Sequence, residues 1–277
     1  NDIKKINGQN KAMYSPMLNY EGGILDDLIV YYLGNKSFRI VSNCATREKN
    51  LSWLSKIAEP FNVGIDFKSD FSILALQGPN SPKFIQSHIE KDISKFSVHN
   101  TDDVMIASTG YTGELGYEII CNQEKGIKFW NDFISNDVQP IGLAARDTLR
   151  LEAGLNLYGT DMDQTNTPYD SNIGWTIDLN DKDRDFIGKK ALEEKKDSKK
   201  ILKGFYTEER GVLRGGAEVI FDGGSGVVTS GTWSPTFKKN IGFCRVDKNC
   251  GEIGCAVLRD KKITLKFSNT NFLESLK

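Results

Sequence analysis

The chain has 277 residues, enough for one large domain or about two of ordinary size. A hydrophobic content of 39%, with 10% aromatic residues, supplies a core and excludes a globally disordered chain. At a net charge of −1, the chain lacks the surplus of basic residues that is typical of nucleic-acid-binding proteins. No apolar run approaches the roughly 18 residues that span a membrane. The sequence therefore predicts neither a nucleic-acid partner nor a membrane partner.

Cysteine and histidine usage narrows the chemistry further. The cysteines are odd in number, form no CxxC pair and lie mostly in apolar, strand-like contexts, which indicates reduced, buried thiols: Cys44, Cys121, Cys244, Cys250 and Cys255. The histidines, His88 and His99, lie beside neither a cysteine nor an acidic cluster, so we expect no metal site. A reducing compartment follows, and both a bacterial cytoplasm and a mitochondrial matrix are of this kind.

The first predicted strand raises a question about two carboxylates. Residues 28–33 (LIVYYL) read as a strand fed by a turn at Gly22-Gly23, and Asp26 and Asp27 stand at its entrance. Carboxylates there are commonly turn residues with solvated side chains. A period of two nevertheless sends adjacent side chains to opposite faces, so one of the two could point inward, where a charge is costly unless it has a task.

Strand-like and helix-like patches then alternate through the first 200 residues. Strands are predicted at SFRIVSN, FSILALQ, DVMIAST and GYEIICN, the last two forming a hairpin around GYTGELG. Helices are predicted at TREKNLSWLSKIAE (with Thr46 as its cap), SPKFIQSHIE, QEKGIKFWNDFIS, GLAARDTLRLEAG and FIGKKALEEKK (interrupted by Gly188).

The charged run EEKKDSKK predicts a domain boundary, with one domain over residues 1–195 and a second over 196–277. Beyond it, six short strands separated by glycine turns indicate a small antiparallel barrel or sandwich. The predicted fold class is α+β, an α/β region with antiparallel sheets and helices followed by a small C-terminal antiparallel β-barrel. From Ile201 onward Lys and Arg outnumber Asp and Glu by 12 to 8, which suits an anionic ligand tail or an ordinary solvated surface.

Three polar segments could carry chemistry. In STGYTGELGYE the glycines allow close backbone approach, Tyr111 could stack on a flat ring, and Glu118 on the returning strand is either an edge charge or a bidentate acceptor for a heterocycle's N–H groups. In AARDTLRLEAG, Arg146 opposes the helix dipole, so we expect it to bind either an anionic or carbonyl-bearing ligand or a buried carboxylate, while Asp147 can pair with Arg150. In GVLRGG, Arg214 lies beside a turn.

Read together, these segments closely resemble the T-protein family of the glycine cleavage system, the aminomethyltransferases. The matching motifs occur in the family's order over nearly all of the chain: KAMYSPMLNYEGGILDDLIVYY, SNCATREKNLSWL, ALQGP, STGYTGELGYE, GLAARDTLRLEAGLNLYG, GWTIDL, RDFIGKKAL, GVLRGG and TSGTWSPT. The resemblance implies a folate-binding first region. It also implies transfer of a one-carbon unit from the aminomethyl-lipoyl arm of the lipoylated H-protein to the co-substrate tetrahydrofolate, with release of ammonia and formation of 5,10-methylenetetrahydrofolate.

The same resemblance implies roles for individual residues. Asp27 would be the catalytic carboxylate and point inward to the folate, while Asp26 stays with the turn. Glu118 would grip the pterin's amino and ring N–H groups, and Arg214 would lie near the anionic glutamate tail. The remaining pocket residues would be Tyr14, Asn43, Tyr111 and Arg146.

The unmatched N-terminal segment and the sharing of this fold by other folate-binding proteins leave alternatives open. Family members carry a segment before the KAMYS-like motif that nothing here matches, so the chain looks truncated at its N-terminus. A folate-dependent demethylase or sarcosine-type relative would share the fold, as would a non-catalytic folate-binding protein. Iron–sulfur assembly relatives of the latter kind carry a cysteine-containing motif, whereas this chain reads RDFIGKKAL at that place.

Overall fold

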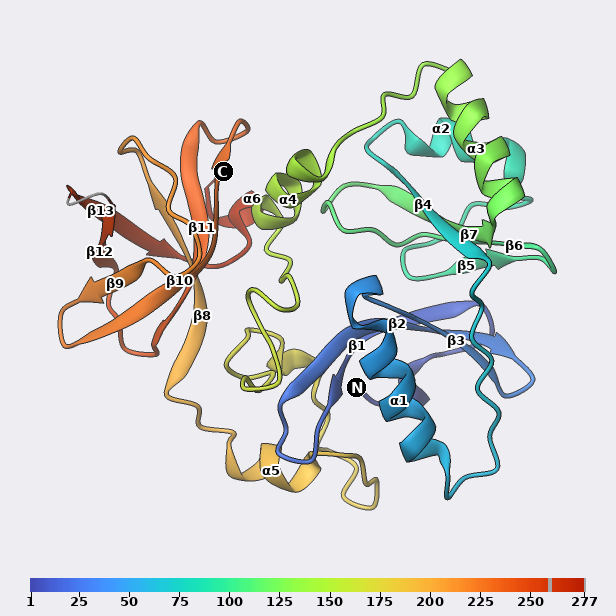
Figure 1. Ribbon diagram of the computed structural model, residues 1–277, viewed down its shortest axis with the longest axis horizontal. Helices are drawn as coiled ribbons and strands as arrows, with labels where there is room; N and C mark the ends of the chain where they lie inside the picture. Colours follow the sequence, from blue (N-terminus) through green and yellow to red (C-terminus); the bar gives the residue numbers. More distant parts are fainter. Residues whose placement is uncertain (259–260, 277) are drawn as a thin grey trace. The chain divides into compact units, whose positions relative to one another are not determined.

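The computed structural model describes residues 1–258 and 261–276, and the chain divides into two compact units (Figure 1). Unit 1 comprises Asn1, Pro16–Asp27 and Leu143–Lys277, and unit 2 comprises Asp2–Ser15 and Leu28–Gly142. The mixed α+β class with a closed, six-stranded antiparallel barrel at the C-terminal end is confirmed.

Unit 2 contains most of a three-stranded sheet and all of a four-stranded sheet. The first has the order β1-β2-β3, formed by Lys11–Leu18, Ile24–Gly34 and Ser37–Ser42. The second has the order β4-β7-β6-β5, formed by Phe71–Gln77, Gly116–Asn122, Val104–Ala107 and Val98–Asn100. The predicted hairpin is confirmed, since β6 and β7 pair antiparallel. The strand predicted at residues 28–33 begins earlier, at Ile24, and therefore includes both aspartates.

The helices of unit 2 are η1 (Ile3–Lys5), η2 (Cys44–Thr46), α1 (Arg47–Ala58), α2 (Ser81–Ile85), η3 (Gln86–His88) and α3 (Gln123–Ser135). The α-helices among them lie at the predicted positions, with shorter bounds in places. The α3 helix begins at an N-cap, because the Asn122 side chain accepts a hydrogen bond from the Lys125 N–H. Thr46 does precede α1, but its hydroxyl donates to the Asn43 carbonyl and makes no cap hydrogen bond.

Strand β7 divides its side chains between two cores of unit 2. Tyr117, Ile119 and Cys121 belong to a core that also contains Ile85 of α2 and Phe133 of α3. Ile120 points to the opposite face and belongs to a second core with Tyr31, Val98, Met105 and Ala107. This alternation is the period of two of a strand that is buried on both faces. Glu118 shares its face with Ile120 and so lies on the side of the second core.

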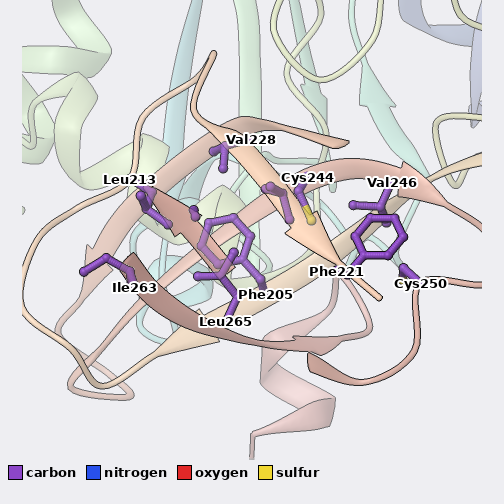
Figure 2. Packing of buried hydrophobic residues seen from close by; sticks show 11 residues of the cluster. Phe205, Leu213, Phe221, Val228, Cys244, Val246, Cys250, Ile263 and Leu265 are labelled. Carbon is purple, nitrogen blue, oxygen red and sulfur yellow. The ribbon is translucent and has the colours of Figure 1, made fainter. Parts of the chain in front are cut away.

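The barrel of unit 1 closes in the order β10-β11-β8-β13-β12-β9, orange to red in Figure 1. Its strands are β8 (Lys200–Thr207), β9 (Glu218–Phe221), β10 (Gly224–Ser234), β11 (Lys239–Asp247), β12 (Ile253–Leu258) and β13 (Lys261–Ser268). Figure 2 shows its core, to which Phe205, Phe221, Val246 and Leu265 contribute side chains. The strands predicted beyond the charged run are confirmed, while Arg259 and Asp260, at the end of the predicted strand GCAVLRD, lie outside the described residues.

The rest of unit 1 is mostly loops and short helices. The helices are α4 (Leu143–Glu152), η4 (Gly174–Thr176), α5 (Lys189–Glu194) and α6 (Phe272–Ser275). Leu151 of α4 packs with Phe243 of β11 and Phe272 of α6. Gly188 does not interrupt a helix: it is the N-cap of α5, at φ +84, where a Cβ atom would collide with the Asn19 carbonyl. The predicted boundary after residue 195 falls between α5 and β8, and a division into domains 1–195 and 196–277 stays a prediction.

Candidate functional site

The turn before β2 is built by an asparagine and two glycines. The Asn19 side chain accepts from the Gly23 N–H at 2.7 Å, and the Asn19 N–H donates to the Gly23 carbonyl. Gly22 has φ +78, and a Cβ atom on Gly23 would overlap the Gln164 carbonyl oxygen. Only glycine fits this close approach, so the turn holds the entrance of β2 against the segment around residue 164.

The two aspartates follow inside β2, and the structure reverses one expectation about them. They do face different surroundings, but Asp26 is the fully buried one, at 0% exposure, whereas Asp27 is partly exposed. Asp26 accepts the Asp27 N–H at 3.0 Å through Oδ1. The expectation that Asp26 stays with the turn is therefore wrong, because the strand begins two residues before it. Of the two residues, Asp27 is the one that solvent reaches.

The glycine-rich segment STGYTGELGYE is folded around a glutamine on another strand. Gln77 Nε2 donates to the carbonyls of Thr109 and Tyr117, both at 3.2 Å, and Gln77 Oε1 accepts from the Thr112 hydroxyl at 3.2 Å. A Cβ atom on either Gly110 or Gly116 would collide with the Gln77 side chain. These two glycines make room for Gln77, which lies on another strand and which the motif itself does not reveal.

Glu118 stands on β7, as predicted, with a hydroxyl directed at it. The Thr109 hydroxyl donates to Oε2 of Glu118 at 2.5 Å, and the Tyr31 hydroxyl lies 3.2 Å from the same threonine oxygen. Burial raises the pKa of Tyr31, and the negative charge of Glu118 raises it further. Sequence reasoning missed both Thr109 and Tyr31, since a hydroxyl in a loop or on a strand carries no signal of its partner.

Three other predicted pocket residues of unit 2 are partly buried. Tyr14 lies on β1, Asn43 is the residue before η2, and Tyr111 lies in the loop between β6 and β7. The Asn43 carbonyl accepts the Thr46 hydroxyl, while its side chain makes no cap hydrogen bond. Each side chain is therefore accessible in part, and a role for each in one pocket stays a prediction.

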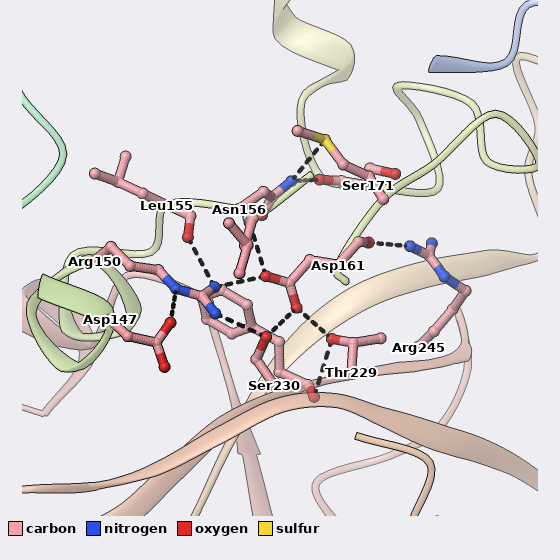
Figure 3. Close-up of polar contacts among 12 residues, drawn as sticks. Asp147, Arg150, Leu155, Asn156, Asp161, Ser171, Thr229, Ser230 and Arg245 are labelled. Carbon is pink, nitrogen blue, oxygen red and sulfur yellow. Dashed lines mark hydrogen bonds and ion pairs between the residues drawn. The ribbon is translucent and has the colours of Figure 1, made fainter. Parts of the chain in front are cut away.

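Helix α4 of unit 1 carries two arginines with different surroundings. Arg146 is exposed, in the first turn of the helix. Arg150 is 1% exposed, and Figure 3 shows its guanidinium between Asp147 and Asp161. Its Nε donates to Asp147 Oδ1 at 2.8 Å, which confirms the predicted i,i+3 pair, and its Nη1 donates to Asp161 Oδ2 at 2.6 Å.

The buried carboxylate of this network reaches the barrel. Oδ1 of Asp161 accepts the hydroxyls of Thr229 and Ser230 on β10, both at 2.6 Å, and Arg150 Nη2 donates to Ser230 at 2.9 Å. Arg150, one turn after Arg146, makes the buried ion pair, and the role of Arg146 stays a prediction. No local pattern identifies Asp161, because it stands in a loop 11 residues beyond its partner.

Arg214 is exposed in the segment between β8 and β9 and donates to the Gly231 carbonyl at 3.4 Å. Its exposure suits an anionic ligand tail as well as solvent. The seven predicted site residues thus divide between the units: Asp27, Arg146 and Arg214 lie in unit 1, and Tyr14, Asn43, Tyr111 and Glu118 in unit 2. That they line one pocket stays a prediction.

Other classes of site find little support in the described part of the chain. Within residues 1–258 and 261–276, nowhere do three or more His, Cys, Asp or Glu side chains gather so as to hold a metal ion. None of the helices described there has the length and apolar character needed to cross a membrane. All five cysteines are unpaired, with Cys121, Cys244 and Cys250 buried, Cys255 partly buried and Cys44 exposed.

Comparison with known protein families gives a match in the N-terminal part of the chain and another in the C-terminal barrel. Residues 1–181 match the GCVT N-terminal domain, and residues 200–273 match the glycine cleavage T-protein C-terminal barrel domain. The structure is also similar to the crystal structure of the glycine cleavage system aminomethyltransferase T from Bartonella henselae. The two share 31% sequence identity at a TM-score of 0.90, over 96% of this chain and 77% of the other.

Proposed function

Because the chain belongs to the glycine cleavage T-protein family, we propose that it is an aminomethyltransferase that passes a one-carbon unit to tetrahydrofolate. The donor would be the aminomethyl group on the lipoyl arm of the H-protein, and the products would be ammonia and 5,10-methylenetetrahydrofolate. The observation that carries the proposal is the family match over both regions. The partly exposed Asp27 would be the family's carboxylate.

Asp27 would be the catalytic residue. A fixed carboxylate orients the accepting amine of the folate and stabilises the positive charge that develops as ammonia leaves. Asp26 supports it from within the strand, since its buried Oδ1 accepts the Asp27 N–H. This hydrogen bond reduces the freedom of the backbone at Asp27 and so favours one position of its carboxylate.

The binding residues would divide the folate between them. Glu118 is an acceptor that matches the amino and ring N–H groups of a pterin, and Tyr111 would pack on the ring. Arg146 would be a polar partner in the pocket, with Tyr14 and Asn43 part of its wall. Arg214 would meet the anionic glutamate tail, for which an exposed guanidinium is suited.

The test measures binding first and transfer second. Isothermal titration of the chain with tetrahydrofolate under reducing conditions is expected to give micromolar binding. The folate-loaded protein is then mixed with aminomethyl-lipoyl H-protein, and ammonia and 5,10-methylenetetrahydrofolate are expected in equal amounts. H-protein with an unmodified lipoyl group is the control and should give neither product.

Two results would contradict the proposal. A folded chain that binds no tetrahydrofolate would exclude the folate-dependent activity for this chain. Folate binding with transfer from sarcosine or dimethylglycine, and none from the H-protein, would instead favour the demethylase-type relative on the same fold.

A further inference from the structure

Glu118 stands on an inner strand of the four-stranded sheet with a small residue on each side. Its register partners are Ala75 on β4 and Ala107 on β6. Residues directly opposite in antiparallel strands share one face of the sheet, and alanines leave space above that face. The two adjoining strands therefore give the carboxylate room, and their residues at its own level offer no side-chain hydrogen-bond donor.

The donor comes instead from Thr109, in a chain of hydroxyl groups with one possible direction. The Thr109 hydroxyl has a single hydrogen, which points to Oε2 of Glu118 at 2.5 Å. Its contact with the Tyr31 hydroxyl at 3.2 Å must then use a hydrogen from tyrosine. The order is Tyr31 to Thr109 to Glu118, and it ends on the carboxylate.

Packing alone does not account for these hydroxyls. Tyr31 has 0% exposure and Thr109 8%, so both hydroxyls have been removed from water. Phenylalanine and valine would fill the same volumes without that desolvation cost. We therefore expect the two hydroxyls to act on Glu118, the charged residue at which the series of hydrogen bonds ends. Glu118 is also the one partly exposed residue of the three.

The series of hydroxyl groups uses only one of the two carboxylate oxygens of Glu118. Oε2 accepts from Thr109, whereas within residues 1–258 and 261–276 no donor lies within hydrogen-bond distance of Oε1. A carboxylate held at one oxygen keeps a single orientation and presents the other to whatever approaches. This arrangement suits a ligand that offers N–H donors.

We propose that Thr109 is a positioning residue, backed by Tyr31, that holds Glu118 so that its carboxylate is preorganised for the N–H groups of the pterin. The inference rests on the proposed folate-dependent function and adds the residues that set the geometry of the grip. The benefit of preorganisation is that the ordering cost of the carboxylate is met before the ligand binds. Thr109 and Tyr31 do not touch the ligand in this scheme.

The test compares Thr109→Val with Thr109→Ser. Valine keeps the volume and removes the donor, so the dissociation constant and KM for tetrahydrofolate are expected to rise on the order of tenfold, the low end for a hydrogen bond to a charged group. The kcat should stay within about twofold, because the reacting atoms are elsewhere. Serine restores the donor and should return KM close to the wild-type value. Far-UV circular dichroism and the melting temperature establish that each variant is folded.

A second pair of variants links the effect to Glu118. In a Glu118→Ala background, Thr109→Val should change folate affinity no further, since the group that it positions is gone. Tyr31→Phe should raise KM by only about twofold to threefold, because Thr109 can still donate. Tyr32→Phe, the next residue on β2, is its matched control and should leave KM unchanged.

The outcomes separate this inference from the function on which it rests. If wild type binds no tetrahydrofolate, the proposed function fails. If wild type binds and Thr109→Val binds equally well, or if serine does not restore the affinity lost with valine, the positioning role is wrong and the proposed function stands. Equal losses in the wild-type and Glu118→Ala backgrounds would likewise show that Thr109 acts on general stability.

Discussion

On β2 the Asp27 N–H donates to the Asp26 carboxylate at 3.0 Å, so a buried acid is hydrogen-bonded by the backbone of its neighbour. A buried carboxylate needs such donors, because an unsatisfied charge in a low dielectric is costly. Asp27 is partly exposed, so water can also hydrogen-bond to its carboxylate. Asp26 is thus the buried member of the pair, and Asp27 is the member that solvent reaches.

Asp27→Asn is expected to remove most transferase activity while the affinity for tetrahydrofolate stays within about a few-fold of wild type. The amide keeps the shape and loses the charge that would stabilise the developing cation. Steady-state transfer assays and folate titration measure the two quantities separately. If affinity falls as far as the rate, Asp27 is a ligand grip and not a catalyst.

Asp222→Asn is the matched control for that substitution. It makes the same chemical change at an exposed position, in the hairpin between β9 and β10. Both rate and affinity should be unchanged. A loss with this variant too would indicate a general effect of lowering the negative charge.

At the residue scale, the sequence predicts which types of side chain matter better than how they are held. A period of two correctly separates Asp26 from Asp27, but which of them is buried depends on where the strand begins. That point is set by the Asn19 and Gly23 hydrogen bonds. Thr109 was not predicted at all, because a hydroxyl and its acceptor nine residues away reveal their contact only once β6 and β7 are paired.

Among the elements, α4 is joined to the barrel by charge as well as by apolar packing. Arg150 and Asp161 are both nearly inaccessible, and Ser230 of β10 contacts both of them. In a buried pair the two desolvation costs are offset only while both partners remain. The attachment of α4 to β10 is therefore sensitive to the removal of either side chain.

Arg150→Met should lower the free energy of unfolding by about 3–5 kcal/mol, because it leaves Asp161 buried without its cation. Urea denaturation followed by fluorescence measures the change. Adding Asp161→Leu to this variant should recover part of the loss, since the orphaned charge disappears with it. A double variant that is as unstable as the sum of the two single variants would contradict this coupling.

Arg146→Met is the control on the same helix, one turn earlier. Its side chain is exposed, and a surface pair contributes at most about 1 kcal/mol to stability. Its unfolding free energy should therefore lie close to that of wild type. A loss of similar size at both positions would point to helix propensity and not to the buried network.

The elements themselves were predictable because their signals are local. Alternation and helical spacing lie within a few residues, as in β7, α1 and α3, and glycine turns separate the barrel strands. The cap of α1 was misjudged, since the Thr46 hydroxyl donates to a carbonyl. The use of Gly110 and Gly116 was likewise not visible, because Gln77 comes from another strand.

At the scale of the whole molecule, each unit buries a weak acid that resists ionisation. Burial raises the pKa of the Cys244 thiol in the barrel to about 12, with a contribution from the nearby Cys250, while Lys203 lowers it. Burial likewise raises the pKa of Tyr31 in unit 2. The unfolded chain ionises both groups at lower pH than the folded chain does.

Stability should therefore fall on the alkaline side. Below pH 9 the Cys244 contribution is fully present, and as the pH rises from 9.0 towards about 12 the unfolded chain loses a proton that the folded chain keeps. This one group removes roughly 1.4 kcal/mol per pH unit in that window, and Tyr31 adds to the slope above pH 10. Urea denaturation between pH 7 and 11 measures it.

Cys244→Ala should flatten the slope between pH 9 and 10, whereas Cys44→Ala, at an exposed position, should reproduce the wild-type curve. A Cys244→Ala curve that runs parallel to wild type would show that this thiol does not govern the alkaline limb. The fold class and the barrel were predictable from the sequence at this scale. The contacts of Asp161 with β10 were not, since they depend on packing between segments far apart in the chain.

The open sheet of unit 2 has a consequence for how the protein behaves in concentrated solution. A closed barrel has no free edge, whereas β4 is an edge strand whose seven residues carry no charge, and its Ile73 is 48% exposed. Such an edge is a template for a strand from another molecule. We expect self-association that rises with concentration, and Ile73→Lys should reduce it in light scattering, while Val257→Lys on the barrel strand β12 should not.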